Sequence, residues 1–209
     1  MSEQNTEEKI LLAAHKVFSK TGFAGARMDD IAKEAGINRA LLHYYYRSKD
    51  KLFELIFHKN FMEFVEGLVK INLSGLDLFS KIEAIVHHQI DSNLKNPNLA
   101  SFILHEMSTN PELLIGMANK KSKGLNNIYQ IFEKSVEEAY QQKLIIKTDA
   151  KQLWMNTVSM CMFPFIGRPM LSEAFKLNEK SFVKLMEERK KTIPAFIIQS
   201  IKTKNKNEK

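Results

Sequence analysis

The stretch from Met28 to Tyr45 constrains the fold of this chain more than any other part of the sequence. Its apolar residues fall where two short crossing helices and a preceding helix must share a core; they are Ile31, Ala35, Ile37, Leu42 and Tyr45. Gly36 stands between the two helical segments, where a tight turn requires positive φ, and the small Ala32 lets the second helix pass close over the first. The spacing therefore predicts a helix-turn-helix over residues 28–47.

The rest of the chain favours helix as well. Eight glycines and five prolines are few for 209 residues, and long stretches rich in good helix formers separate them. We expect an all-α fold with a three-helix N-terminal domain, residues 1–48, and a helical C-terminal domain, residues 49–209. Hydrophobic periodicity and breaker residues predict helices at about 6–21, 28–35, 39–46, 49–71, 76–94, 98–108, 111–142, 149–166 and 178–202. The helix at 49–71 links the two domains.

Polar and basic side chains lie on the outward face of the second helix of the helix-turn-helix. Asn38 is expected to cap this helix, and Arg39 follows as the best reader of a base edge, because its guanidinium can donate two hydrogen bonds to guanine. Ala40 and Leu41 can meet a thymine methyl group. The pattern predicts that this helix enters the major groove of double-stranded DNA. Further DNA contacts are expected from Arg27, Met28, His43, Tyr44 and Lys49.

Net charge adds little to this prediction, although the chain carries a formal charge of +7. Residues 1–60 hold 10 Lys and Arg against 8 Asp and Glu, whereas residues 176–209 hold 10 against 4. The excess therefore sits mostly at the C-terminal end, away from the helix-turn-helix. Recognition of DNA must rest on a few placed groups, above all Arg39, together with dimerisation.

The N-terminal residues resemble the TetR family of bacterial transcriptional regulators. The family pattern appears as ILLAAHKVFSKTGF at 10–23 and as DDIAKEAGINRALLHYYYRSKDKLFELIF at 29–57. The resemblance implies dimerisation through the last two helices, a palindromic operator, and usually repression that a small ligand releases. Two departures fall on positions expected to face DNA: Ala26 and Arg27 stand where many members carry Thr or Ser, and His43 stands where a phosphate-binding Tyr is common.

The C-terminal helices carry no signature of a particular ligand, but the chain is rich in Met and Phe, with ten and fourteen residues respectively. Thioethers and aromatic faces suit an adaptable apolar cavity, and the same residue types also build ordinary cores. If such a cavity exists, it would hold a small-molecule effector. The residues predicted to line it are Met107, Met117, Trp154, Met155, Met160 and Phe163.

The last two helix patterns are apolar on more than one side, so one face needs a partner. A second copy would cover it in a four-helix interface, and the two-fold symmetry of this homodimer would set the recognition helices about 34 Å apart. The residues predicted to form the interface are Met162, Phe165, Phe182, Met186, Ile193, Phe196 and Ile197.

Catalytic and metal-binding patterns are not found in the sequence. His87 and His88 are adjacent, so their side chains diverge on a helix rather than chelate, and no nucleophile, base and acid stand in a recognisable arrangement. The single Cys161 excludes an intramolecular disulfide. We therefore expect neither an enzyme nor a metal or cofactor.

The acidic start of the chain and the short, interrupted apolar stretch from Leu153 to Ile166 predict no signal peptide and no membrane span, which favours the cytoplasm. Two other functions fit the composition: a helical module that binds a small molecule or a protein, and a helical enzyme. Steeply salt-dependent binding to duplex DNA would separate a DNA-binding regulator from both.

Overall fold

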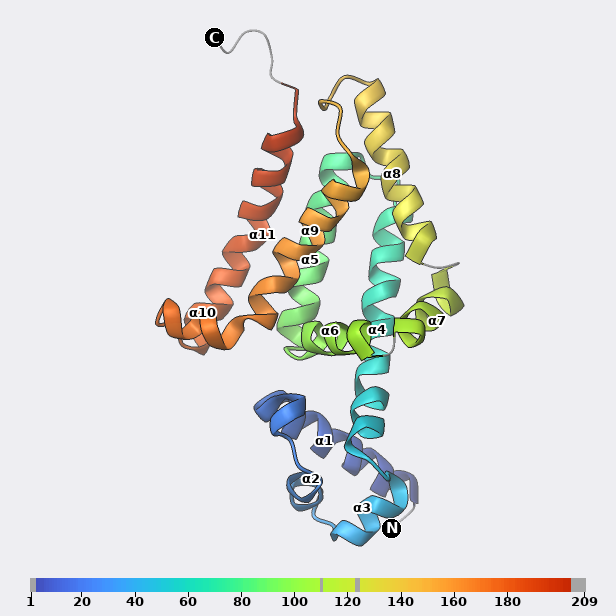
Figure 1. Cartoon of the computed structure of the whole chain (residues 1–209), viewed down its shortest axis with the longest axis vertical. Coiled ribbons are helices and arrows are strands. Elements are labelled where there is room, and N and C mark those ends of the chain that lie inside the picture. Colours follow the sequence, from blue (N-terminus) through green and yellow to red (C-terminus); the bar gives the residue numbers. More distant parts are fainter. Residues whose placement is uncertain (1–2, 110, 123–124, 204–209) are drawn as a thin grey trace.

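The structure is a computed structural model that describes residues 3–109, 111–122 and 125–203 (Figure 1). The all-α fold predicted from the sequence is confirmed, because regular structure in the described ranges is helical apart from an isolated β-bridge between Ile145 and Lys202. The helices are α1 (Glu3–Gly25), α2 (Met28–Ala35), α3 (Arg39–Tyr45), α4 (Lys49–Leu73), α5 (Leu78–Lys95), α6 (Leu99–Thr109), α7 (Pro111–Ser122), α8 (Leu125–Gln141), α9 (Ala150–Ile166), α10 (Arg168–Ala174) and α11 (Glu179–Ile201).

Two glycines shape the N-terminal helices, and the turn at the second, Gly36, was predicted from the sequence. Gly22 has φ 69° and ψ 174°, so the regular part of α1 stops there although the ribbon continues to Gly25. Gly36 is left-handed, with φ 67° and ψ 32°. It ends α2 because the following Ile37 N–H can then donate to the carbonyl oxygen of Ala32 at 3.0 Å. The chain thereby reverses within two residues and begins α3.

The core runs without interruption from the N-terminal helices into the C-terminal ones. Ile31 of α2 and Leu42 of α3 are fully buried, and α2 packs against both α1 and α3. Phe18 of α1 contacts Phe53 of α4, with ring centroids 5.0 Å apart, and Phe57 of α4 contacts Phe102 of α6 at 5.6 Å. Helix α4 is therefore the mechanical link between the two ends of the molecule, and Figure 1 shows it running from α3 upward past α6.

Two predictions for the C-terminal half differ from the structure. The single helix expected at 111–142 is two helices, α7 and α8, which run in different directions in Figure 1. The apolar periodicity of the sequence continues across this junction, so the prediction did not divide the segment. No helix was expected between residues 166 and 178, but α10 lies there, with Pro169 in its first turn, where a proline costs no hydrogen bond.

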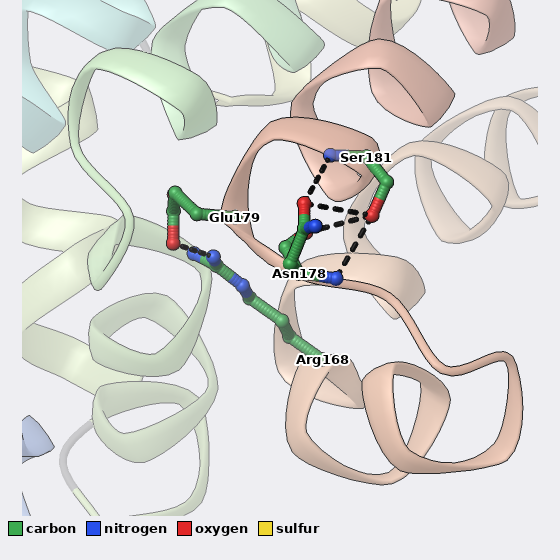
Figure 2. A network of polar contacts seen from close by, with 4 residues as sticks. All are labelled: Arg168, Asn178, Glu179 and Ser181. Carbon is green, nitrogen blue, oxygen red and sulfur yellow. Dashed lines mark hydrogen bonds and ion pairs between the residues drawn. The ribbon is translucent and has the colours of Figure 1, made fainter.

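The start of α11 is fixed by side chains from both sides of the turn after α10. Asn178 and Ser181 form a capping box, in which the Asn178 side chain accepts from the Ser181 N–H at 2.9 Å and the Ser181 hydroxyl accepts from the Asn178 N–H at 2.8 Å (Figure 2). Arg168 of α10 pairs with Glu179, and its guanidinium lies 4.4 Å from the ring centroid of Phe182. These contacts join the start of α10 to the first turn of α11.

Candidate nucleic-acid interface

Helix α3 is built so that its N-terminal turn is exposed and well ordered by its cap. Asn38 has extended backbone, with φ −79° and ψ 160°, and its side-chain oxygen accepts from the Leu41 N–H at 2.8 Å. This satisfies one of the free donors at the start of the helix. Leu42 on the opposite side is fully buried and anchors α3 to the core. Figure 1 places α3 at the end of the molecule farthest from α8.

Arg39 is the first residue of α3, and its side chain is 65% exposed. Its Nη1 donates to Asp29 Oδ2 of α2 at 3.2 Å, and its Nε donates to His43 Nε2 at 3.5 Å. The Asp29 carboxylate is itself 62% exposed, and an ion pair between two such side chains contributes little to stability. The guanidinium can therefore leave Asp29 for a base edge at small cost.

Several other predicted contacts share this exposed side. Tyr44 is 75% exposed and Leu41 is 37% exposed. Ala40 and Arg27 are also exposed, and His43 is half-buried. Asn38, Arg39, Ala40, Leu41, His43 and Tyr44 all belong to α3 or its cap, so the short helix brings them to one end of the molecule.

Met28 and Lys49 are placed differently from their predicted roles. Met28 is half-buried and packs against the core, which leaves little of it for DNA. The Lys49 ammonium donates to the carbonyl oxygen of Phe23 at 2.8 Å and lies 4.3 Å from the centroid of that ring. Lys49 therefore joins the start of α4 to the end of α1 instead of reaching outward for a phosphate. The prediction considered the position of Lys49 at the start of α4 but not its contact with Phe23, which only the tertiary structure brings close.

A cavity of about 390 Å³ lies between the C-terminal helices. Two of the residues predicted to bind a ligand line it, Met107 and Trp154. Met155 and Phe163 are 49% and 55% exposed on the surface of α9, Met160 is half-buried outside the lining, and the side chain of Met117 lies outside the described residues. The lining comprises Phe61, Phe64, Leu68, Gln89, Ile103, Met107, Pro111, Leu114, Ile115, Trp154, Val158 and Met162.

The chain is similar to known bacterial regulators of transcription. The bacterial regulatory proteins of the tetR family match residues 10–56, which span the helix-turn-helix. The chain is 28% identical over 172 residues to the HTH-type transcriptional repressor NicS of Pseudomonas putida, covering 80% of this chain and 79% of NicS. It is 23% identical over 177 residues to the IcaR negative transcriptional regulator of the icaADBC biofilm operon from Staphylococcus aureus, covering 84% and 90%.

The N-terminal domain of the chain, over residues 10–56, is that of the tetR family of bacterial regulatory proteins. Solved structures of family regulators share its fold over nearly the whole length. The hemolysin II transcriptional regulator HlyIIR aligns with a TM-score of 0.57 at 19% identity, covering 97% of this chain and all of HlyIIR. The ketosteroid regulator KstR2 of Mycobacterium tuberculosis aligns with a TM-score of 0.67 at 9% identity, covering 98% of each chain. The chain is a DNA-binding transcriptional regulator with a helical C-terminal region.

The residues predicted to form a TetR-type dimer interface lie mostly inside the protomer. Met162 lines the cavity, and five others are buried: Phe165, Phe182, Met186, Ile193 and Ile197. Helix α5 covers this face of α11, so an intramolecular helix supplies the packing that the sequence had assigned to a second copy. Phe196 is the exception, because its side chain is 62% exposed.

Sequence reasoning missed Gln89 and all three of the α4 residues that line the cavity. Phe61, Phe64 and Leu68 recur at helical spacing on one face of α4 and could have been recognised as a wall. Gln89 lies on the buried face of α5 between Val86 and Ile90, and Lys81 and Asn93 are the other polar residues buried on this helix. A polar residue in such a position is the signal that could have identified it.

Neither a metal-ligand cluster nor a helix able to span a membrane occurs in the described residues. No group of three or more His, Cys, Asp or Glu side chains there is placed to hold a metal ion. None of the helices in the same ranges combines the length and apolar character that a membrane crossing requires. The named relatives are transcriptional regulators, not enzymes.

Proposed function

We propose that this protein is a repressor that binds a palindromic operator as a homodimer and dissociates when a small apolar molecule occupies the cavity. The observation that carries the proposal is the double role of α4. Its first residue follows the helix-turn-helix directly, and Phe61, Phe64 and Leu68 farther along the same helix line the cavity. The printed names of NicS and IcaR support repression as the direction of control.

Base reading is assigned to Arg39, with Ala40 and Leu41 beside it for thymine methyl contacts. Replacement of Arg39 by Ala should weaken binding to the preferred operator by about 1–3 kcal/mol and relax the preference at one base pair. Replacement of Arg27 by Ala should instead weaken binding to all DNA sequences alike, as expected of a phosphate contact. The slope of log affinity against log salt concentration should become shallower by about one. An unchanged sequence preference in the Arg39 variant would remove Arg39 from base reading.

The dimer interface is assigned to the exposed aromatic side chains of α9 and α11. Phe163 is 55% and Phe196 is 62% exposed, and the two helices are joined by a hydrogen bond from Arg189 Nη2 to the Met160 carbonyl oxygen at 2.8 Å. Replacement of Phe196 by Glu should convert a dimer to a monomer in size-exclusion chromatography with light scattering. Leu12, which is 73% exposed on α1, provides the control: Leu12→Glu should leave the dimer intact.

Coupling between cavity and DNA is assigned to α4 and α6 together. Ile103 and Met107 of α6 line the cavity, and Asn98, just before α6, donates to the Phe18 carbonyl oxygen of α1 at 2.7 Å. A molecule that displaces these helices would therefore move the helix-turn-helix. Release requires that the effector bind the DNA-free conformation more tightly, and coupling of about 1–3 kcal/mol is typical.

The decisive experiment is selection of binding sites from random duplex DNA by the purified protein. The proposal predicts a two-fold symmetric site with half-sites about one helical turn apart, and affinity that falls steeply with salt. An asymmetric site bound by one protomer would contradict the dimeric arrangement. Absence of salt-dependent duplex binding would favour a helical module that binds a small molecule or a protein.

A further inference from the structure

Gln89 is the polar side chain with unused hydrogen-bonding groups in an otherwise apolar cavity. From this we propose that the cavity selects an uncharged, flat, mostly apolar molecule that presents a hydrogen-bond donor beside an acceptor, as a cyclic secondary amide does. The inference rests on the proposed function in taking the cavity as the effector site. It adds the chemical class of the effector and the residue that selects it.

The amide of Gln89 lies on the buried face of α5, and the residue is fully buried. Neither Nε2 nor Oε1 has a hydrogen-bond partner among the described residues, although both atoms are shielded from solvent. Most buried polar side-chain atoms in folded proteins are paired, because an unpaired group loses its hydration without replacement. Gln89 is one of the residues that line the cavity, so a molecule bound there lies beside this side chain.

Charge on the bound molecule is disfavoured by the other lining residues. Those that the structure describes are aliphatic, aromatic or sulfur-containing apart from Gln89, and none of them carries a formal charge. An anion or a cation would lose its hydration there without gaining a counter-ion. The amide of Gln89 is neutral and can satisfy one donor and one acceptor.

Flat shape is favoured by the aromatic walls. Phe61 and Phe64 contribute from α4 and Trp154 from α9. Trp154 is held edge-on to Phe132 with centroids 5.1 Å apart, and Phe64 is stacked on His88 at 5.4 Å. These rings offer faces and edges to a planar molecule. The volume of about 390 Å³ is within the range of small-molecule sites.

The N–H and C=O groups of a lactam are complementary to the carbonyl oxygen and NH₂ group of Gln89. Its ring N–H donates to Oε1 while its carbonyl oxygen accepts from Nε2, so both orphan groups are paired by adjacent atoms of one ring. A purely apolar ring of the same size would leave both unpaired. The structure thus assigns Gln89 as the residue that distinguishes a lactam from a hydrocarbon.

The test compares three bicyclic probes in calorimetric titrations of the full-length protein. Carbostyril has an adjacent donor and acceptor, N-methylcarbostyril has the acceptor alone, and naphthalene has neither. Two hydrogen bonds predict that carbostyril binds about tenfold to a hundredfold more tightly than naphthalene, with N-methylcarbostyril between them. Equal affinity for carbostyril and naphthalene overturns the role of Gln89, and failure to bind any of the three at millimolar concentration overturns the ligand class.

The variant Gln89→Leu keeps the approximate size of the side chain and removes both polar atoms. It should lose the preference for carbostyril, and naphthalene should bind it at least as well as it binds the native protein. The variant should also melt at a higher temperature without ligand, because an unpaired buried amide has been removed. Gln130→Leu, at an exposed position of α8, should change neither property. A lower melting temperature in Gln89→Leu, or a preference that persists, overturns the proposal.

Operator binding separates this inference from the proposed function. If carbostyril binds through Gln89 but leaves the affinity for operator DNA unchanged, the ligand class stands and release by the effector is wrong. If the operator is bound and Gln89→Leu retains the native ranking of the probes, regulation of DNA binding stands and the role of Gln89 is wrong.

Discussion

Replacement of Gly67 by Ala tests the packing between α4 and α5 beside the cavity. A Cβ atom at Gly67 would lie 2.1 Å from Cε1 and 2.4 Å from Nε2 of His88. Carbon atoms in contact prefer about 3.5–4.0 Å, so the imidazole would have to move by more than 1 Å. His88 Nε2 is 2.8 Å from the Phe64 carbonyl oxygen, and its ring is stacked on Phe64 at 5.4 Å with an interplanar angle of 14°.

Two opposing effects decide the sign of the change. Alanine is favoured over glycine in a helix by about 1 kcal/mol. Displacement of His88 forfeits one hydrogen bond, about 0.5–1.5 kcal/mol, and one stacked pair, about 0.5–1.5 kcal/mol. The loss of about 1–3 kcal/mol exceeds the gain, so the free energy of unfolding should fall by about 1 kcal/mol. For a chain of this length the melting temperature should drop by about 2–4 °C.

Calorimetric melting of three variants isolates the contact. Gly116→Ala is the matched control, because a Cβ there meets nothing within 4 Å and only the helix propensity should change, raising the melting temperature. In a protein that already carries His88→Ala, the clash disappears and Gly67→Ala should become stabilising. If Gly67→Ala stabilises the native protein as Gly116→Ala does, the placement of His88 against Gly67 is refuted.

Three buried side chains carry predictions about titration and reactivity. Burial raises the pKa of the Cys161 thiol to about 12, so a thiol reagent at pH 8 should leave the folded protein unmodified and label it in guanidinium; rapid labelling without denaturant would contradict the burial. Burial and the hydrogen bond from its hydroxyl to Glu7 at 3.1 Å raise the pKa of Tyr46 to about 12. Because the unfolded tyrosine ionises near pH 10, stability should decline from about pH 10 to pH 12, and a Tyr46→Phe variant with the same decline would refute this assignment. Burial lowers the pKa of Lys81, which donates to Ser135 Oγ at 2.6 Å, so its contribution to stability should increase as pH rises toward the unfolded pKa of about 10.4. Lys81→Met should abolish that increase in urea titrations at successive pH values, and an unaltered pH profile would exclude Lys81 as its source.

Local chemistry allowed the recognition element to be predicted from the sequence. The left-handed turn at Gly36 and the cap at Asn38 depend on residues within a few positions of each other, and both are present as expected. Pro169 also follows a local rule, because prolines are favoured in the first turn of a helix. The prediction did not apply that rule, so it missed α10. Interactions within one or two turns of helix are encoded by residue type and spacing, so they can be read without the fold.

Contacts between distant segments could not be read in this way. Lys49 was expected to reach a phosphate, yet it bonds to Phe23, which is 26 positions away. Ile193 and Ile197 were expected to meet a second copy, yet α5 buries them within the protomer. An apolar stripe specifies that a helix face will be covered but does not specify by which helix.

The cavity shows the same division most clearly. The sequence by itself determined that α4 is a long amphipathic helix after the helix-turn-helix and that Trp154 stands in an apolar segment. Only the tertiary structure decided that Phe64, Gln89 and Trp154 face one space, because their juxtaposition results from the packing of three helices. The physical reason is that helix formation depends on neighbours along the chain, whereas a cavity is the volume that side chains from separate helices leave unfilled.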